Sequence, residues 1–183
     1  MRKIICAINI TLDGFCDHTA GIVDDDLHEY YTEFMGKMGI SVMGRKTYEL
    51  MENYWPEVAK NKTGTDSEIR FAENFDEIQK IMISRSRKSV TWNNSSIISE
   101  NVIEEISKLK EGSGKQISVG SPSIISLLTR NNLVDEFMLL IHPIILGTGL
   151  KLFKEIAQRV DLELLATKAF NSGVIVTHYR VKP

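Results

Sequence analysis

The feature that most constrains the fold is Lys3–Ile10, a nearly unbroken apolar run that includes Ile4, Ile5, Cys6, Ala7 and Ile8. A run without alternating polar residues is typical of a strand that is covered on both faces, as in the sheets of α/β proteins. Similar runs recur along the chain. They predict further strands over Gly39–Met43, Ile78–Ser84, Gln116–Val119 and Asp135–Ile141.

Segments with helical character lie between these predicted strands. Helices are predicted over Asp24–Met38, Thr47–Glu52, Asp66–Asn74, Asn101–Lys110 and Ile124–Leu128. Loops are predicted over Thr11–Asp24, Asn53–Thr65 and Pro143–Gly149, and Val90–Ile98 is expected to be irregular or an edge. Because strands alternate with helices, the chain is predicted to have an α/β fold with a mostly parallel sheet.

The C-terminal part has a different pattern. Asp161–Ala169 and Val174–Val181 alternate between polar and apolar residues and flank the turn sequence Asn171-Ser172-Gly173. This combination predicts an antiparallel hairpin. The hairpin would close the parallel sheet with an antiparallel edge.

Length and charge exclude some classes of protein. The 183 residues fit one domain over residues 1–183, and the content of 43% hydrophobic and 25% charged residues is ordinary for a soluble globular domain. The net charge of −2 argues against a nucleic-acid binder, which usually has a strong basic excess. A local basic patch for a phosphorylated small molecule is still compatible with this charge.

Metal and membrane functions have little support in the sequence. Cys6 and Cys16 form no C-x-x-C motif, and the histidines form no short-spaced pair of ligands, so a structural zinc site is not expected. The apolar run after Met1-Arg2-Lys3 is interrupted by Asn9 and is too short for a signal segment or a membrane span. We therefore predict a cytoplasmic protein.

Three segments that suit an anion follow predicted strands. Gly44 ends one strand, and Arg45, Lys46 and Thr47 enter the first turn of a helix, where unpaired backbone N–H groups favour negative charge. Taken alone, this segment is better explained by a strand–turn–helix junction with a solvated basic pair.

The other two segments are Ser84–Lys88 and Gly120–Ser123. The first is a basic cluster, and a run of charges like this is usually a solvated turn. The second combines a glycine with a serine and a proline that suit a helix start, and here an anion site and a plain junction are equally good interpretations. Ligands of α/β sheets bind beyond the carboxyl ends of the strands. Three such segments together favour a phosphorylated dinucleotide.

Several motifs, in this order along the chain, resemble the dihydrofolate reductase superfamily, and most closely its RibD C-terminal type, the reductase domain of riboflavin biosynthesis. They are Ile8–Phe15, Met43–Glu49, Ile83-Ser84-Arg85, Val119-Gly120-Ser121, Leu133–Phe137 and Pro143–Gly149. The resemblance implies one dihydrofolate reductase-like domain, with three α/β/α layers around an eight-stranded, mostly parallel sheet that ends in an antiparallel hairpin. It also implies NADPH as the hydride donor.

The resemblance assigns cofactor contacts residue by residue. It places the nicotinamide at Ala7 and Ile8, and the phosphates at Gly44, Arg45, Lys46 and Thr47. It places the adenosine 2′-phosphate at Ser84, Arg85 and Ser86, and the pyrophosphate and nicotinamide at Gly120, Ser121, Ser123 and Ile124. The Thr11–Asp24 loop would be a flexible lid beside the active site.

The substrate is less well defined. The zinc deaminase that is commonly fused to the riboflavin enzyme is not expected in this sequence, which has no H-x-E or P-C-x-x-C motif. Thr47-Tyr48-Glu49 is closer to the folate enzymes. By analogy with those enzymes, Asp26 would assist proton transfer, with Asp24 and Asp25 as competitors. Partial burial would raise the pKa of Asp26. Ordinary capping of the helix is the alternative.

We therefore predict an NADPH-dependent reductase of a pteridine-like or aminopyrimidine heterocycle, similar to 5-amino-6-(5-phosphoribosylamino)uracil reductase or dihydrofolate reductase. The alternatives are a non-catalytic, dimeric nucleotide-binding module of the same fold and a folate reductase of the drug-resistance type. A homodimer is predicted, because Pro143–Gly149 and the hairpin residues Leu162, Leu164 and Leu165 offer more apolar surface than one core needs.

Overall fold

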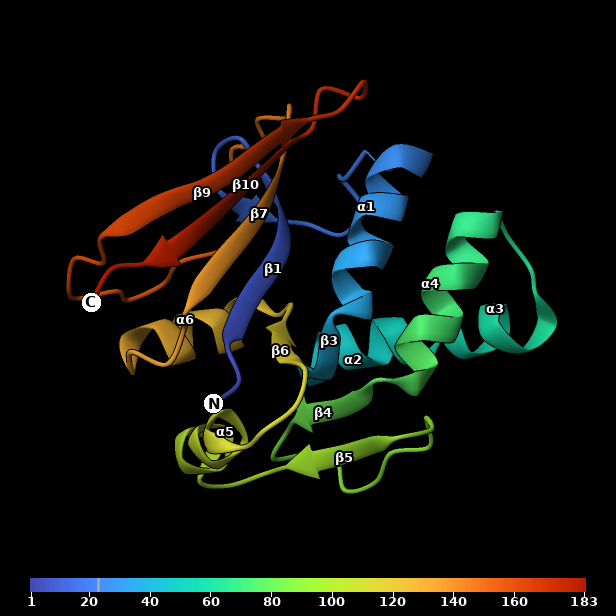
Figure 1. Ribbon diagram of the computed structural model, residues 1–183, viewed down its shortest axis with the longest axis horizontal. Helices are drawn as coiled ribbons and strands as arrows, with labels where there is room; N and C mark the ends of the chain where they lie inside the picture. Colours follow the sequence, from blue (N-terminus) through green and yellow to red (C-terminus); the bar gives the residue numbers. More distant parts are fainter. Residues whose placement is uncertain (23) are drawn as a thin grey trace. The chain divides into compact units, whose positions relative to one another are not determined.

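The computed structural model of the protein describes residues 1–22 and 24–183. Val23, in the predicted Thr11–Asp24 loop, lies outside the described residues. The main strands form an eight-stranded sheet in the order β5-β4-β3-β6-β1-β7-β10-β9 (Figure 1). This order confirms the predicted α/β fold with an antiparallel end. The chain divides into two compact units, which are described in turn.

The first unit comprises residues 1–2 and 25–118. Its strands are β3 (Met38–Gly44), β4 (Gln79–Ile83), β5 (Ser95–Ile98) and most of β6 (Gln116–Val119). Its helices are α1 (Asp25–Gly36), α2 (Arg45–Glu52), α3 (Trp55–Asn61), α4 (Asp66–Glu77) and α5 (Val102–Glu111). β4 pairs in parallel with both β3 and β5. α4 packs against α1 and α3 (Figure 1).

An additional helix and a shifted boundary are examples of how this unit differs from the prediction. Trp55–Asn61, which was predicted to be loop, forms α3, because Pro56 occupies the start of the helix, where the missing N–H costs nothing. Met38, which was predicted to end the first helix, begins β3 after α1 has ended at Gly36.

Lys80 of β4 is a fully buried cation. Its Nζ donates to the carbonyl oxygens of Phe75, Asp76 and Ile78, each at 2.9 Å, and lies 4.8 Å from the centroid of the Trp92 ring. These carbonyls are at the C-terminal end of α4, where unpaired oxygens favour a cation. Burial, opposed in part by Asp76, lowers the pKa of Lys80 to about 8.

The second unit comprises residues 3–24 and 119–183. Its strands are β1 (Ile4–Thr11), β2 (Phe15–Cys16), β7 (Glu136–His142), β8 (Leu150–Lys151), β9 (Leu162–Ala169) and β10 (Ile175–Val181), and its helix is α6 (Pro122–Arg130). β1 and β7 are parallel, whereas β10 is antiparallel to both β7 and β9. The predicted hairpin is therefore confirmed, and its turn is closed by Gly173 at a φ of 84°.

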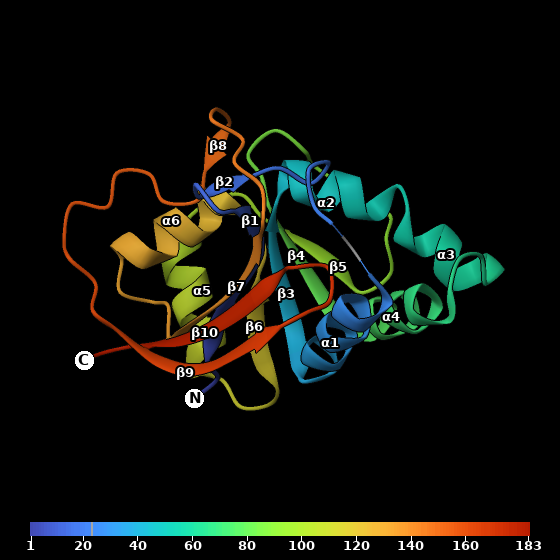
Figure 2. The ribbon, with the colours of Figure 1, turned by 90° about the horizontal axis from the view of Figure 1, so that it is seen from above.

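The loop after β1 has more structure than was predicted. β2, inside the predicted Thr11–Asp24 loop, pairs with β8 in a separate two-stranded sheet (Figure 2). The prediction of a continuous loop was wrong here, because two-residue strands are too short to leave a periodic pattern in the sequence.

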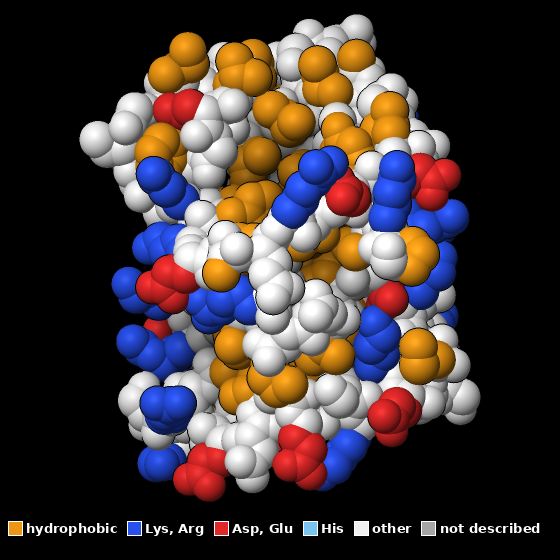
Figure 3. Space-filling view, turned by 90° about the vertical axis from the view of Figure 1, so that its left-hand side faces the viewer, with side chains coloured by type: hydrophobic (Ala, Val, Ile, Leu, Met, Phe, Trp, Pro, Cys, Tyr) orange, Lys and Arg blue, Asp and Glu red, His pale blue; other side chains and the backbone are white. Residues whose placement is uncertain are grey.

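β9 forms one edge of the eight-stranded sheet, and all eight of its residues are exposed. Its register with β10 shifts at a bulge, so that Leu164 faces Tyr179 and Ala166 faces His178, while Leu165 has no partner in the register. Figure 3 shows the left-hand side of the view in Figure 1, where groups of hydrophobic side chains lie between charged ones. None of the helices in the described residues is long and apolar enough to cross a membrane.

Candidate functional site

Two of the predicted anion-binding segments are neighbours in the first unit. Gly44 is the last residue of β3, and it faces Ile83, the last residue of β4, in the parallel register. The segments that follow these two adjacent strands therefore begin at the same carboxyl end of the sheet; they are Gly44–Thr47 and Ser84–Ser86. α2 begins directly after Gly44, with Arg45 and Lys46 exposed in its first turn.

The cations of this unit differ in how they are paired. Nη1 of Arg45 lies 3.1 Å from both carboxylate oxygens of Glu49, one turn further along α2. Nη1 of Arg87 lies 2.8 Å from Oε2 of Glu52, and its guanidinium lies 5.4 Å from the centroid of the Tyr48 ring. Burial alone would raise the pKa of Glu52, but hydrogen bonds from Arg87 and Thr91 lower it. Arg87 is thus held by α2.

The turn after β4 is built by Ser84, which is buried. Its Oγ accepts a hydrogen bond of 3.0 Å from the backbone N–H of Arg87. Arg85 and Ser86 are exposed at the tip of this turn, and Nζ of Lys88 donates to the carbonyl of Arg85 at 3.2 Å. Within the described residues, the side chain of Arg85 has no acidic partner. Its guanidinium can therefore bind a phosphate without breaking an ion pair.

The other predicted cofactor contacts lie in the second unit. A Cβ at Gly120 would lie 3.5 Å from the carbonyl oxygen of Ala7, so β1 and the segment before α6 are close neighbours. Ala7 and Ile8 are buried on β1, as are Ser121 and Ile124 at the start of α6. These four residues can offer mainly backbone groups to a ligand, whereas Ser123 is exposed.

Asp26 does not have the environment that was predicted for it. It lies in the first turn of α1, as expected, but its side chain is exposed. The premise that Asp26 is partly buried is therefore wrong. Its position beside Asp25 suits an ordinary interaction with the helix dipole.

The loop that follows β1 is tied to the loop that follows β7. Asp13 accepts hydrogen bonds from Oγ1 of Thr11 at 2.5 Å, from the N–H of Gly147 at 2.7 Å and from the N–H of Leu146. The hydrogen bond from Thr11, followed by that from Gly147, lowers the pKa of Asp13. Residues 11–16 are thus anchored, which the prediction of a flexible lid did not anticipate.

Two polar residues in this region were missed by sequence reasoning. His142, at the end of β7, lies between Asn9 of β1 and the backbone of Ile22. Asn9 and His142 are 133 residues apart in sequence, and no motif links them. The one available signal was that Asn9 interrupts an apolar strand.

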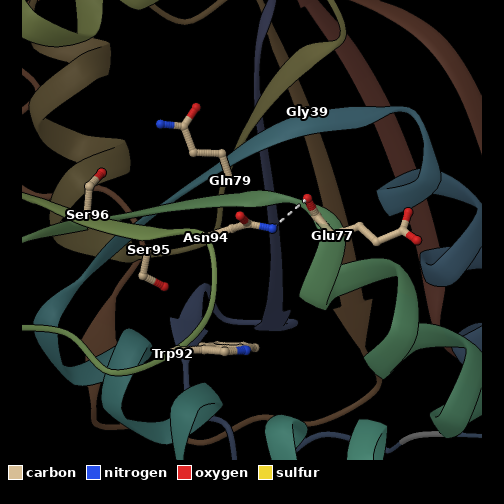
Figure 4. A pocket seen from close by; sticks show the side chains of 7 residues that line it. All are labelled: Gly39, Glu77, Gln79, Trp92, Asn94, Ser95 and Ser96. Carbon is tan, nitrogen blue, oxygen red and sulfur yellow. Dashed lines mark hydrogen bonds between the residues drawn. The ribbon is translucent and has the colours of Figure 1, made fainter.

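The first unit also contains a hollow of about 510 Å³ at the amino-terminal ends of β4 and β5. Figure 4 shows Trp92 along one wall, and the side-chain amide of Asn94 donates to the carbonyl of Glu77 at 3.4 Å. None of the predicted cofactor residues lines this hollow. It is therefore distinct from the strand ends that carry Gly44 and Ser84.

The comparisons with known proteins identify the class. The family model of the RibD C-terminal domain matches residues 2–176, and the chain therefore belongs to this family. Two Bacillus subtilis proteins are related over nearly their whole length. The uncharacterized protein YyaP is 35% identical over 184 residues, which cover 97% of this chain and 94% of that protein. The uncharacterized protein YwjB is 24% identical and covers 98% of both chains.

Solved structures share the fold. A putative riboflavin biosynthesis protein from Shewanella has a TM-score of 0.73 at 17% identity and covers 99% of both chains. A pyrimidine reductase-like protein from Corynebacterium diphtheriae has a TM-score of 0.68 at 16% identity, covering all of this chain and 92% of that one. The Thermotoga maritima diaminohydroxyphosphoribosylaminopyrimidine deaminase/5-amino-6-(5-phosphoribosylamino)uracil reductase has a TM-score of 0.66 at 15% identity, and the match covers 99% of this chain and 57% of that enzyme.

Proposed function

We propose that the protein is an NADPH-dependent reductase that transfers a hydride to a pteridine-like or aminopyrimidine heterocycle. Membership of the RibD C-terminal family supports a reductase. The observation that carries the choice of cofactor is the turn after β4, where Ser84 presents the exposed Arg85 and Ser86 at a carboxyl strand end. We propose a cytoplasmic location, as the sequence predicts.

The residues present fit NADPH. Arg85 can bind the 2′-phosphate through its planar guanidinium, which matches phosphate oxygens in pairs. The helix starts at Gly44–Thr47 and at Gly120–Ile124 provide backbone N–H groups for the phosphates. The nicotinamide would supply the hydride, while the protein provides binding and orientation.

The substrate is proposed by class alone. A heterocycle related to riboflavin precursors or to folate agrees with the family and with the motifs around Thr47-Tyr48-Glu49. Because Asp26 is exposed, we propose that any contribution it makes to proton transfer is small. A non-catalytic nucleotide-binding module is the alternative that the experiment must exclude.

The proposal is tested by two measurements on the unmodified protein. Isothermal titration should show tighter binding of NADPH than of NADH. Oxidation of NADPH, followed by its absorbance, should then be stimulated by one member of a panel of pteridines and aminopyrimidines that includes dihydrofolate. Binding without turnover of any member would favour the non-catalytic module, and no binding of either nucleotide would refute the proposal.

We also propose that the protein is a homodimer in which β9 contacts a second copy. An edge strand presents unpaired backbone groups, and β9 adds the exposed side chains of Leu162, Leu164 and Leu165. Burial of a leucine is worth about 1.5–3 kcal/mol, so Leu164→Glu should weaken the dimer by at least about tenfold. Sedimentation should show this change, and Asn171→Glu in the exposed turn is the control. A monomer at micromolar concentration would contradict the proposal.

A further inference from the structure

Asn9 has an unusual position in β1. The other seven residues of this strand are buried, whereas Asn9 is exposed. It directly follows Ala7 and Ile8, which are the predicted nicotinamide contacts. A polar, exposed side chain at this place needs an explanation, since the rest of the strand is apolar except for Thr11.

The side chain of Asn9 is held by a buried histidine. His142 is 2% exposed, and its Nε2 lies 2.9 Å from Oδ1 of Asn9. The backbone N–H of Ile22 donates to Nδ1 of His142 at 3.0 Å. Gly21 lies against the ring, since a Cβ there would be 3.4 Å from Cε1 of His142. The imidazole therefore bridges β1 and the end of the loop that follows it.

This geometry fixes the protons and the orientation of the amide. A backbone N–H can only donate, so Nδ1 of His142 must accept and carries no proton. In the neutral imidazole the proton then lies on Nε2, which donates to Asn9. The atom of Asn9 that faces Nε2 must therefore be the oxygen. Both N–H donors of the amide are turned away from His142, and no residue in ranges 1–22 and 24–183 accepts from them.

The charge environment keeps His142 neutral. Burial lowers its pKa, and β1 has no charged side chain. The acids Asp13 and Asp17 of the adjoining loop are bound to Thr11, Leu146 and Gly147 and to Thr19, respectively. Glu136 lies at the other end of β7, where it binds Lys3 and His178, and Arg180 of β10 pairs with Glu136 in the register.

We infer that Asn9, oriented by His142, is a ligand-binding residue whose amide donates to a carbonyl acceptor on a planar ring. This inference rests on the proposed function and extends it to a residue that neither the family resemblance nor the cofactor prediction assigns. Two ligands have the required chemistry: the carboxamide of the nicotinamide ring and a ring carbonyl of a pyrimidine substrate. His142 is a positioning residue in this arrangement.

Asn9→Asp is the decisive variant, because a carboxylate oxygen still accepts from Nε2 of His142 while both donors are lost. Thermal unfolding should confirm that the variant is folded. Asn171→Asp, with the same change of charge in the exposed turn, is the matched control. The probes are NADPH, adenosine 2′,5′-bisphosphate and 5-aminouracil, measured by titration or by saturation-transfer NMR.

The expected result for Asn9→Asp is a loss of at least about tenfold in affinity for one of the carbonyl-bearing probes. A loss for NADPH but not for adenosine 2′,5′-bisphosphate identifies the carboxamide, and a loss for 5-aminouracil alone identifies the substrate. Unchanged binding of NADPH and of 5-aminouracil overturns the inference and leaves the proposed function intact. If the unmodified protein binds neither NADPH nor 5-aminouracil, both are overturned.

NMR provides a second test that needs no variant. The imidazole nitrogens of His142 should show the Nε2–H tautomer. The side-chain N–H signals of Asn9 should shift when the probe that binds in the titrations is added. Binding should weaken as the pH falls below the ordinary histidine pKa of about 6.5, because a proton on Nδ1 would oppose the N–H of Ile22. The Nδ1–H tautomer, or unmoved Asn9 signals at saturation, would overturn the inference.

Discussion

Two strand–helix junctions of this protein have the same local plan but different chemistry. At the end of β3, Gly44 precedes a helix whose first turn carries Arg45 and Lys46. At the end of β6, Gly120 precedes Ser121 and a helix that begins with Pro122 and has no acid in its first turn. The first junction is exposed and charged, whereas the second is largely buried and uncharged.

If the proposed function is right, the difference predicts two kinds of phosphate contact. Charged side chains around the first junction can distinguish nucleotides by their phosphates, and this interaction is screened by salt. Backbone N–H groups at the second junction recognise any anion of suitable shape and add little selectivity. If this division holds, substitutions near β4 should change the affinity for NADPH more than the affinity for NADH. Substitutions at α6 should change both affinities equally.

The largest effect is expected for Arg85→Ala. A hydrogen bond to a charged group is worth about 1.5–3 kcal/mol, so the loss should weaken NADPH binding by roughly 10- to 100-fold. NADH, which has no 2′-phosphate, should be almost unaffected. Isothermal titration with the two nucleotides measures the difference.

Lys88→Ala, three residues further on, is a control with the same change of charge. Its Nζ donates to the carbonyl of Arg85, so a small effect is expected. Thr47→Val should weaken both nucleotides, because both contain the pyrophosphate. Equal losses for NADPH and NADH in Arg85→Ala would show that the arginine does not bind the 2′-phosphate.

The sequence predicted both junctions because each consists of neighbouring residues. The apolar runs of β1 and β3 and the turn Asn171-Ser172-Gly173 were equally local, so the sheet and its hairpin were confirmed. Pairings between distant residues could not be predicted in this way. Glu52 neutralises Arg87 across 35 residues, which removes one of the cations counted in the basic cluster.

Burial was also hard to infer from local sequence. Asp26 opens an aromatic helix, which suggested a partly buried acid, but in the structure it is exposed. The tie between Asp13 and Gly147 and the bridge between Asn9 and His142 both depend on the parallel pairing of β1 with β7. Such contacts follow from the register of the strands, which no local motif encodes.

A smaller effect is expected for Ser123→Glu at the uncharged junction. A repulsion of about 1 kcal/mol between the new carboxylate and the pyrophosphate corresponds to roughly fivefold weaker binding. NADPH and NADH should be affected equally. Ser123→Gln, similar in size but neutral, is the control. An effect on NADPH alone would contradict the proposed difference between the junctions, because α6 would then also contact the 2′-phosphate.

The smallest effect is expected for Asp26→Asn. This variant tests whether the first unit, which contains the charged junction, contributes to catalysis in addition to binding. An exposed acid in the first turn of a helix stabilises it through the dipole by about 0.3–1 kcal/mol, and a small decrease in unfolding temperature should follow. Loss of a general acid would instead reduce turnover by about 10²–10⁴-fold. Since Asp26 is exposed, we expect turnover with the best substrate of the panel to change by less than about twofold, far below that range. Asp25→Asn, the adjacent first-turn acid, should behave in the same way. A large loss of turnover confined to Asp26→Asn would restore this residue as the proton donor, and the first unit would then supply catalysis as well as the selection of the cofactor.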